Sequence, residues 1–515
     1  MEEFKDAVRE RDAERVRALL VAHPQLRADI DRPDFEAAAP AIVFCRHDRA
    51  MVDVLLEFGA DINVRSQFWG RAVGVLDDTT PEMRAYLIQR GAIPEIGDFI
   101  EAVHGRDAAR LRSLLTASPV LRAHIDRPLF SFGAQAIVVA KNDQSVVETL
   151  LEFGANINVK TDWWAGGFGV LDDTEPRQAA WLIERGAIVD IHAAAGLAMA
   201  DKVREWIAKD PSLVHAPGGD GKRPLHWAST TEIIDLLLAH GAEIDARCID
   251  HRSTAAQYRV RDTQLCRHLI SCGAEVDIFM AAALGDEGLV ERAVNADPGC
   301  LAARIGRPGY APVPPGHIYQ WRLEAASVLL VAARHGGRKI YEFLLTRSPL
   351  KEQFLAACER ADEALALGVL AERPDLVTEL TADDRGQIVA AAFAHNIPAL
   401  ELMLKLGFDV NTRGGEGFTP VGHAALRGHV DTVRLLIAQG ADLEIRNQYG
   451  GTALEGCQWG SLNFRDPSGD YGACVESLVQ AGAKLTYPGF GSDAVQAVLR
   501  RYAVSSQRNC DPEMQ

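Results

Sequence analysis

The sequence predicts an all-α repeat protein in which short helical hairpins stack along one axis as a solenoid. The first observation behind this prediction is an internal duplication: residues 4–96 and 99–191 align without a gap at an offset of 95, and 51 of the 93 aligned pairs are identical. The second is a series of glycines that recur 32 or 33 residues apart. Such repetition is typical of modules that cannot bury their apolar faces alone. We therefore expect about fifteen helix–turn–helix repeats.

Composition and charge bound the function. The 515 residues carry a formal net charge of −17, and no cluster of Lys and Arg forms the basic stripe that nucleic-acid binding needs. No apolar run approaches the roughly 18 residues of a membrane span, and the first residues are acidic, unlike a signal peptide. We expect a cytoplasmic protein with no nucleic-acid partner and no membrane association. Its charge favours a basic protein or a cationic ligand.

The nine cysteines show no Cys-x-x-Cys pair. Cys266, His268 and Cys272 lie close in sequence, but one helix cannot direct all three side chains at a single ion. We therefore expect buried, reduced thiols and no metal site. No cofactor is predicted, because the phosphate-binding, metalloprotease and nucleophile-elbow motifs are all missing.

The recurring glycines mark the ends of helices. A glycine just past a helix supplies a left-handed cap at no steric cost, and the spacing of these residues gives a period of about 33. The predicted cap glycines are residues 59, 91, 154, 186, 241, 273, 407, 440 and 482.

A second kind of repeat ends in proline, which stops a helix because it cannot continue the hydrogen-bond ladder. One proline-capped repeat followed by two glycine-capped repeats forms a triplet, and this triplet occurs three times. The predicted proline-capped ends are His23-Pro24, Ser118-Pro119, Asp210-Pro211, Asp297-Pro298, Ser348-Pro349 and Arg373-Pro374.

The clearest repeat runs from Gly417 to Asn447. Thr419-Pro420 starts its first helix, Gly428 ends that helix, and Gly440 caps the second. Its remaining landmarks are Ala424-Ala425, Gly428-His429, Leu435-Leu436 and Gly440-Ala441-Asp442. With these landmarks the chain resembles the ankyrin repeat family, whose repeats carry Thr-Pro-Leu-His, Ala-Ala, Gly-His, Leu-Leu and Gly-Ala-Asp at this spacing. The resemblance implies helical hairpins joined by β-turn fingers, and recognition of proteins through finger tips and the concave helix face.

The resemblance divides the chain into six parts. It is strong near the C-terminus, good in the triplets and weak between them. The predicted parts are ankyrin-like triplets at 1–96, 97–191 and 192–278, divergent ankyrin-like units at 279–400 with a Pro/Gly-rich insertion at 305–321, near-consensus ankyrin repeats at 401–487, and a C-terminal cap helix and tail at 488–515.

Two pairs of aspartates depart from the family pattern. Asp77 and Asp78, and their copies Asp172 and Asp173, follow Gly-Val-Leu where the family has Thr-Pro-Leu-His. One interpretation is that an aspartate caps a shortened helix. The other is that these carboxylates line the concave groove and bind a cation, a hydroxylated ligand or a basic side chain.

Large aromatic residues occupy the fingers before these aspartates. Phe68 and Trp69 lie in the first, and Trp163 and Trp164 in the second. Because a turn tip has little core to fill, large aromatics there indicate a contact surface. The alternative is that each ring folds back onto the neighbouring finger.

Other polar residues complete the candidate surface. Asp250, His251 and Arg252 lie in a later finger, either as part of the same groove or as a solvated loop. His226, within Arg-Pro-Leu-His-Trp-Ala, holds the position of the family histidine, for which the resemblance implies hydrogen bonds between neighbouring turns. His192 replaces a phenylalanine that opens four proline-capped repeats, at Phe4, Phe99, Phe279 and Phe354. This position favours a core histidine.

These observations lead to a functional prediction: a bacterial ankyrin-repeat scaffold that recognises a protein partner through aromatic and acidic finger tips and its concave face. The alternative is a small-molecule-binding protein or an enzyme with a concave pocket of Trp, Asp and His residues. Asp172 or Asp173 would then act with His192, His226 or His251. No catalytic residue is assigned.

Overall fold

The computed structural model describes residues 1–67, 72–323, 327–464, 466–485 and 491–508. Within these ranges the chain is helical, and its only β-type pairing consists of isolated bridges such as Phe35 with Ala39. The all-α repeat fold is therefore confirmed. Two compact bodies make up the chain: the N-terminal body, residues 1–256 with 267–274, and the C-terminal body, residues 257–266 with 275–515.

The N-terminal body contains the first two predicted triplets and most of the third. Its helices are α1 (Glu2–Arg9), α2 (Ala13–Ala22), η1 (Pro24–Asp29), η2 (Glu36–Ala38), α3 (Ala41–Phe44), α4 (Arg49–Glu57), α5 (Pro81–Gln89), α6 (Glu95–His104), α7 (Ala108–Ala117), α8 (Pro119–Ala123), η3 (Ser131–Gly133), α9 (Ala136–Val139), α10 (Gln144–Glu152), α11 (Pro176–Glu184), α12 (Ile191–Gly196), α13 (Ala200–Lys209), η4 (Pro211–His215), η5 (Gly219–Gly221), α14 (Pro224–Trp227) and α15 (Thr231–Ala239). Two further helices, α16 (Ala255–Tyr258) and α17 (Thr263–Ser271), contain residues of both bodies.

The C-terminal body contains the divergent and the near-consensus repeats. Its helices are α18 (Ile278–Ala283), α19 (Glu287–Ala296), η6 (Pro298–Ala302), α20 (Tyr319–Arg322), α21 (Val328–Val331), η7 (Ala332–Gly336), α22 (Gly337–Leu345), α23 (Leu350–Glu359), α24 (Glu363–Glu372), α25 (Leu376–Glu379), α26 (Ala382–Arg385), α27 (Gln387–Phe393), α28 (Ile397–Lys405), η8 (Gly415–Gly417), α29 (Pro420–Arg427), α30 (Val430–Ala438), α31 (Ala453–Asn463), α32 (Tyr471–Gln480) and α33 (Asp493–Arg508).

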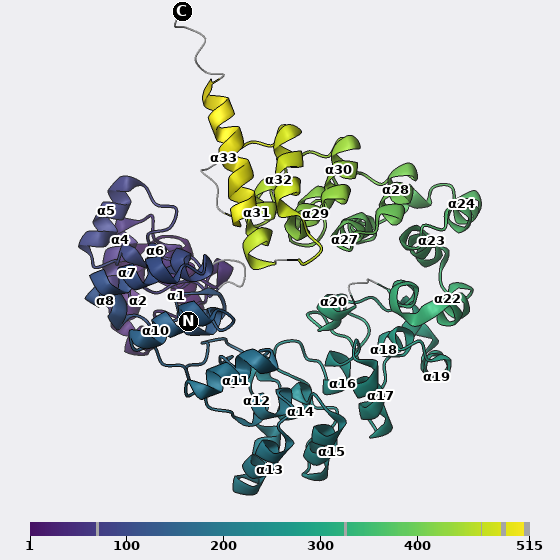
Figure 1. The fold of residues 1–515 in the computed structure, drawn as a ribbon, viewed down its shortest axis with the longest axis horizontal. Helices are drawn as coiled ribbons and strands as arrows, with labels where there is room; N and C mark the ends of the chain where they lie inside the picture. The colour runs from purple at the N-terminus through teal and green to yellow at the C-terminus, as the bar shows by residue number, and fades with distance from the viewer. Residues whose placement is uncertain (68–71, 324–326, 465, 486–490, 509–515) are drawn as a thin grey trace, which may run out of the picture. The chain divides into compact units, whose positions relative to one another are not determined.

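Helices of successive repeats stack in two rows. In the C-terminal body α27 contacts α29 and α29 contacts α31, while α30 contacts α32 in the second row (Figure 1). Within each repeat the two helices also pack together, as α29 does with α30. The apolar face of each hairpin is thus covered by the next hairpin in sequence, as expected for a repeat fold.

All nine predicted cap glycines have left-handed backbone conformations. Their φ angles run from 82° at Gly440 to 106° at Gly273. After each glycine, the next N–H returns to the carbonyl five residues earlier; Ala60 N, for example, lies 3.0 Å from Leu55 O. This bond satisfies one of the carbonyls that a helix leaves unpaired at its end. The prediction of glycine caps is confirmed.

Proline follows the helix end by two residues at five of the six predicted positions; at the sixth, α22 stops at Leu345, four residues before Pro349. Helices α2, α7, α13 and α19 stop two residues before their prolines, and a short helix starts at each proline. The phenylalanines that open these repeats fill the interior: Phe4, Phe99, Phe279 and Phe354 are all buried. His192 is buried in the equivalent position, and its Nε2 lies 2.8 Å from the carbonyl oxygen of Ala216.

Asparagine side chains join successive glycine-capped repeats. The Asn63 amide donates to Gly91 O at 3.1 Å and accepts from Ile93 N at 2.8 Å. Asn158 makes the same two bonds at the same distances in the second copy. These bonds fix each finger against the end of the next helix, so the fingers are held in register with the stack.

The structure departs from the sequence prediction at three places. The Gly-Val-Leu-Asp-Asp segments at 74–78 and 169–173 form turns and not shortened helices. The sequence predicts a closing helix from Asp493 to Tyr502, whereas α33 continues to Arg508. All eight described cysteines are free, but Cys272 is exposed whereas the other seven are buried.

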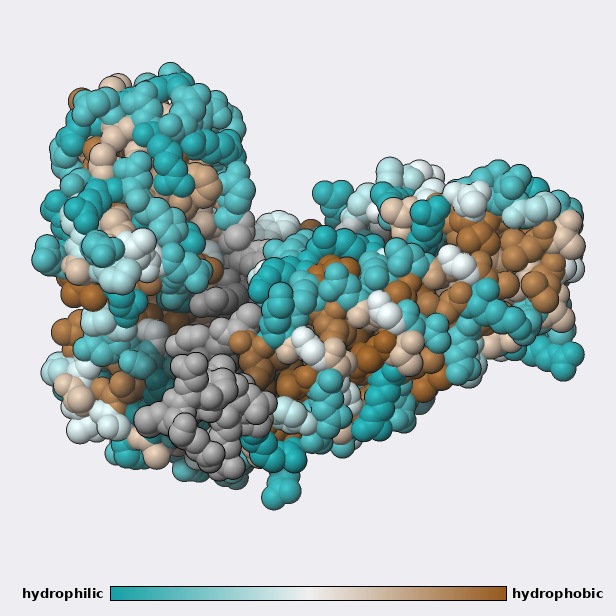
Figure 2. All heavy atoms as spheres, turned by 90° about the horizontal axis from the view of Figure 1, so that it is seen from above, coloured by the Kyte–Doolittle hydropathy of each residue, from teal (hydrophilic) through white to brown (hydrophobic). Residues whose placement is uncertain are grey.

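The surface is mixed in polarity. On the face drawn in Figure 2, hydrophilic side chains cover most of the area and hydrophobic side chains gather in strips between them. Large apolar side chains that are exposed in the N-terminal body include Trp164, Ile188 and Ile249. No described helix is both long and apolar enough to cross a membrane.

Candidate functional site

Backbone hydrogen bonds join the fingers of the N-terminal body into a continuous edge. Phe132 N donates to Gln67 O at 3.1 Å, and Asp162 N donates to Gly133 O at 2.9 Å. Further along, Asp220 N donates to Gly166 O at 3.3 Å, and Ile249 N donates to Asp220 O at 3.1 Å. We call residues 130–135, 161–168, 217–222 and 247–253 the finger edge. Its tips are held by main-chain bonds, so they present their side chains on a rigid frame.

An aromatic cluster lies on this edge. The Phe132 and Trp163 rings meet edge to face with centroids 4.9 Å apart, and the Trp163 and Trp164 centroids are 6.0 Å apart. Trp164 is 64% exposed and Phe132 is 40% exposed. Trp163 therefore supports two outward-facing rings, an arrangement that favours a contact surface over simple core packing. Phe68 and Trp69, predicted for the same role in the first copy, lie outside the described residues.

A second aromatic group lies further along the edge and holds a lysine. The rings of Phe168 and Trp227 meet edge to face at 6.4 Å. The Lys222 ammonium lies 3.8 Å from the Trp227 centroid and 5.2 Å from that of Phe168. Gly219 packs directly on Phe168, since a Cβ there would come within 2.5 Å of the ring. This lysine is buried, so the aromatic rings stabilise its charge in place of water.

The predicted polar finger gathers around a residue that the sequence analysis did not select. Ligand atoms of Asp220, Asp250 and His251 all lie within 4.8 Å of one another. His251 Nε2 is 3.8 Å from Asp250 Oδ2, and Lys222 Nζ is 3.7 Å from Asp220 Oδ2. Arg252 is exposed beside this cluster with φ of 50°.

Burial raises the pKa of Asp220, and this is the largest influence on that carboxyl. Lys222 and His251 oppose the shift by attraction, whereas Asp250 and Asp173 add to it by repulsion. Asp173 is exposed. The pKa of Lys141 is lowered, chiefly by burial, and the charge of Asp173 opposes this shift. Charges of both signs therefore lie together along the finger edge. We call Lys141, Asp173, Lys222, Asp220, Asp250 and His251 the charged row.

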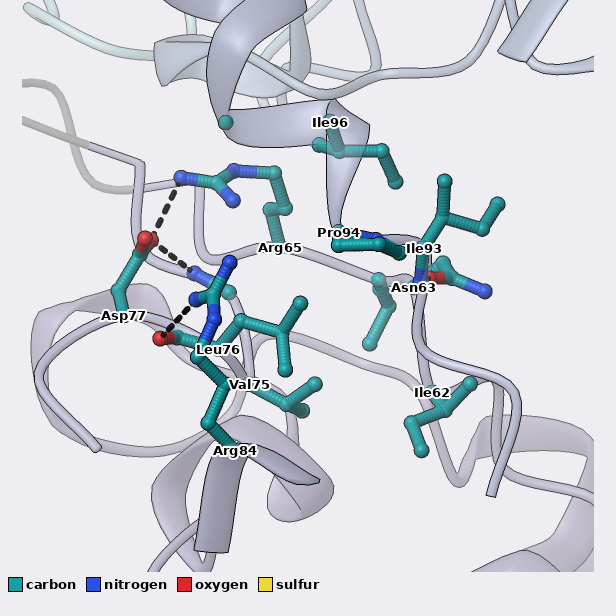
Figure 3. A pocket seen from close by; sticks show the side chains of 13 residues that line it. Ile62, Asn63, Arg65, Val75, Leu76, Asp77, Arg84, Ile93, Pro94 and Ile96 are labelled. Atoms are coloured by element: carbon teal, nitrogen blue, oxygen red, sulfur yellow. Dashed lines mark hydrogen bonds and ion pairs between the residues drawn. The ribbon is translucent and has the colours of Figure 1, made fainter. Parts of the chain in front are cut away.

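The first aspartate of each pair braces its own loop. Asp77 Oδ2 accepts from Gly74 N at 2.8 Å and from Arg65 Nη2 at 2.7 Å, and Arg84 Nη1 donates to Leu76 O at 3.2 Å (Figure 3). Asp172 Oδ2 accepts from Gly169 N at 2.7 Å in the same way. Neither caps a following helix, because α5 begins after Thr80 and α11 after Glu175.

The second aspartate of each pair turns the chain. Asp78 and Asp173 have φ of 56° and 49°, and both are exposed. Aspartate tolerates this left-handed region better than most residues. Asp173 is also the one of the four paired carboxylates whose charge raises the pKa of Asp220.

His226 lies in the interior. Its Nε2 is 3.0 Å from Ser253 O, and its Nδ1 accepts from Arg223 N at 3.2 Å. Burial lowers the pKa of this ring to about 4. The side chain thus joins neighbouring turns, as the family resemblance implied.

The Pro/Gly-rich insertion at 305–321 enters the core of the C-terminal body. Tyr319 OH donates to Asp277 Oδ2 at 2.8 Å, and Gln257 Nε2 donates to the same oxygen at 2.9 Å. His317 Nε2 lies 3.0 Å from Gln257 Oε1. All four side chains are buried, so this part of the insertion is a structural brace.

Two hollows of the N-terminal body bear on small-molecule binding. The first encloses about 40 Å³ between Asn63, Arg65, Asp77 and Ile96 (Figure 3). A drug-sized ligand needs roughly 300–1,000 Å³, so this space is too small. The second lies open between α7 and α10 and is lined by residues such as Arg112 and Glu148. Neither hollow contains Trp164, Asp172 or His226.

The residues that the sequence analysis missed carry weak sequence signals. Phe132 has alanine at the equivalent position of the first copy, so the duplication does not point to it. Lys222 and Asp220 lie in a glycine-rich finger that reads as an ordinary turn. In the folded chain, Asp220 lies with Asp250 and His251 of the next finger, and Lys222 lies against the Trp227 ring. The sequence alone does not show these contacts.

Comparison with known families gives two matches. Residues 388–487 match a family model described as Ankyrin repeats (3 copies), and residues 220–249 match one described as Ankyrin repeat. The chain therefore contains ankyrin repeats, both in the C-terminal body and in the third predicted triplet. No curated protein matches the chain.

Proposed function

We propose that this ankyrin-repeat chain is a binding scaffold that takes a protein partner on the finger edge of its N-terminal body. Ankyrin repeats generally serve as scaffolds for protein–protein interaction. The observation that carries the proposal is the exposed Trp164 ring beside Trp163 and Phe132. Rigid aromatic side chains of this kind anchor protein interfaces because they bury much area at a small entropic cost.

The charged row supports a partner with both apolar and basic side chains. Asp173 is exposed, and Asp220, Asp250 and His251 lie together on the finger edge. The net charge of −17 also attracts a basic segment at long range. Arg or Lys of the partner would meet the carboxylates while an apolar side chain covers Trp164.

Small-molecule binding or catalysis at Trp, Asp and His residues is the weaker candidate. His226 already uses both ring nitrogens in the interior, and the Asp172 carboxylate accepts a backbone N–H of its own loop. The cytoplasmic location, the bacterial source and the lack of a nucleic-acid partner stay predictions from the sequence.

The test is selection of a displayed library of random peptides on the full-length chain, followed by affinity measurement for the selected peptides. We expect peptides rich in apolar and basic residues that bind Phe132→Ala/Trp164→Ala at least about tenfold more weakly, the loss that truncating an interface anchor gives. Trp459→Ala is the matched control, since this tryptophan is also exposed but lies on α31 of the C-terminal body. Unchanged affinity in the double variant, or an equal loss in the control, would remove the finger edge as the binding surface.

A further inference from the structure

One face of the third triplet brings together a carboxylate, an imidazole and a thiol. His268 lies in α17, and Cys272 follows one helical turn later, with its N–H donating to His268 O at 3.0 Å. Asp235 approaches from α15. His268 Nε2 is 2.7 Å from Asp235 Oδ1, and Cys272 Sγ is 3.8 Å from His268 Nε2 and 3.9 Å from Asp235 Oδ1.

The first triplet shows what normally occupies this place. Counted from the cap glycines, Asp53 corresponds to Asp235, and Tyr86 and Arg90 correspond to His268 and Cys272. Arg90 Nη2 lies 2.5 Å from Asp53 Oδ1, and the Tyr86 hydroxyl donates to the same oxygen. A permanent cation therefore neutralises the carboxylate here.

The second triplet repeats that arrangement. Arg185 Nη2 binds Glu148 Oε1 at 2.7 Å, and its guanidinium stacks on Trp181 with 3.6 Å to the ring centroid. Only in the third triplet is the arginine replaced by cysteine and the aromatic residue by histidine. The acid is kept, but the cation and the aromatic residue are exchanged for two side chains that ligate transition metals.

We propose that Asp235, His268 and Cys272 bind a Zn²⁺ ion, which takes the place that arginine fills in the first two triplets. Zinc accepts sulfur, nitrogen and oxygen ligands at about 2.3, 2.0 and 2.0–2.2 Å. Tetrahedral angles at these lengths separate the ligand atoms by roughly 3.3–3.7 Å. The two separations that involve sulfur already come close to this range. The separation of Asp235 Oδ1 and His268 Nε2 has to grow by less than about 1 Å.

The surroundings allow such a site to load. Asp235 and Cys272 are exposed and His268 is partly exposed, so an ion reaches all three from solvent. Cys272 also differs from the seven buried cysteines of the described chain. Binding converts its thiol to thiolate and releases the proton to solvent. Water would complete the coordination, because this cluster supplies three protein ligands.

Cobalt(II) provides the test, since it takes the place of zinc and its absorption reports thiolate ligation. The full-length chain is stripped with a chelator and titrated with Co²⁺. We expect one equivalent to give a sulfur-to-cobalt charge-transfer band that Zn²⁺ then abolishes. Cys272→Ser should lose the band, and Asp235→Asn and His268→Ala should each weaken Co²⁺ binding at least tenfold.

Two controls separate this site from others. Cys510→Ser, a change outside the described residues, should keep the band. Far-UV circular dichroism should show that Cys272→Ser stays folded, since this side chain is exposed. Absence of a charge-transfer band at saturating Co²⁺, or its persistence in Cys272→Ser, would overturn the proposal.

Discussion

Arg65 binds Asp77 across 2.7 Å between Nη2 and Oδ2, whereas Lys160, its counterpart in the second copy, binds Asp190 at 2.7 Å. The duplication has therefore preserved the aspartate but changed its electrostatic surroundings. Asp172 keeps the bond from Gly169 N, yet burial raises the pKa of its carboxyl. Equivalent residues of the two copies thus differ in how they contribute to stability.

Substitution by asparagine should distinguish these two aspartates. Asp77→Asn removes the charge paired with Arg65, and we expect the free energy of unfolding to fall by about 1–3 kcal/mol. Asp172→Asn retains an oxygen for the Gly169 N–H and removes a buried charge, so its unfolding midpoint should not fall. Urea unfolding followed by circular dichroism measures both. A greater loss in Asp172→Asn than in Asp77→Asn would contradict these roles.

Acid should destabilise the N-terminal body through His226. Its folded-state pKa is lowered to about 4, below the ordinary histidine value of 6.5, because the ring is buried. The neutral ring therefore favours folding above the unfolded pKa, and that stability is lost as pH falls from 6.5 towards 4. At about pH 5 this loss amounts to about 2 kcal/mol. Urea unfolding of His226→Gln should show a lower stability near pH 7 and a smaller decrease on acidification; an unchanged decrease would exclude His226 as its source.

Two glycines of the near-consensus repeats should respond differently to alanine. Gly440 has φ of 82° and open space where a Cβ would lie, so Gly440→Ala costs only backbone strain of about 1–2 kcal/mol. At Gly460 a Cβ would lie 2.0 Å from Leu426 O, which forces α31 away from α29. Gly460→Ala should therefore lower the thermal unfolding midpoint more than Gly440→Ala does. The reverse order would show that α31 and α29 do not pack this closely.

The two finger tryptophans should separate stability from binding. Trp164 is mostly exposed, so Trp164→Ala should change the free energy of unfolding by less than about 0.5 kcal/mol. Trp163 lies beneath it against Phe132, and Trp163→Ala should cost about 1–3 kcal/mol. Chemical unfolding of both variants provides the comparison. Equal losses would mean that Trp164 also holds the fold together.

The proposed zinc ligands should be transferable to the first triplet. Tyr86→His with Arg90→Cys places the same side chains opposite Asp53, at positions equivalent to those of His268 and Cys272. The double variant should bind a second equivalent of Co²⁺ with the same charge-transfer band. Arg90→Ser with Tyr86→His is the control, since it lacks the thiolate. A stoichiometry that stays at one would show that these three positions alone do not define the site.

Much of the fold follows from the sequence because the caps are encoded locally. In one kind of repeat a glycine ends the second helix, and in the other kind a proline two residues past the helix end does so. Each residue sets the backbone conformation within a single turn. The turns at Asp77 and Asp172 are harder to predict. There, the aspartate side chain accepts a hydrogen bond from the N–H of a glycine three residues earlier. This bond stabilises a turn where the family pattern implies a helix.

The candidate surfaces are only partly predictable, because they combine side chains from separate repeats. Trp163, Trp164 and Asp250 are visible in the sequence as unusual finger residues. Asp220 joins them only through contacts between fingers. The sequence offers Cys266 as the third neighbour of His268 and Cys272, which argues against a shared ion. In the folded chain the third side chain of that cluster comes instead from Asp235, on a different helix.

The nine cap glycines share one further property: each closes its helix with the same bond from the following residue to the carbonyl five positions earlier. Two repeats whose helices end in the same backbone geometry can be followed by the same chain segment. Recombination between Gly59 and Gly154 would therefore add or remove 95 residues without disturbing the path of the main chain on either side. The first and second triplets, identical at 51 of 93 aligned positions, are consistent with such an event. A repeat fold of this kind can change its length by whole modules.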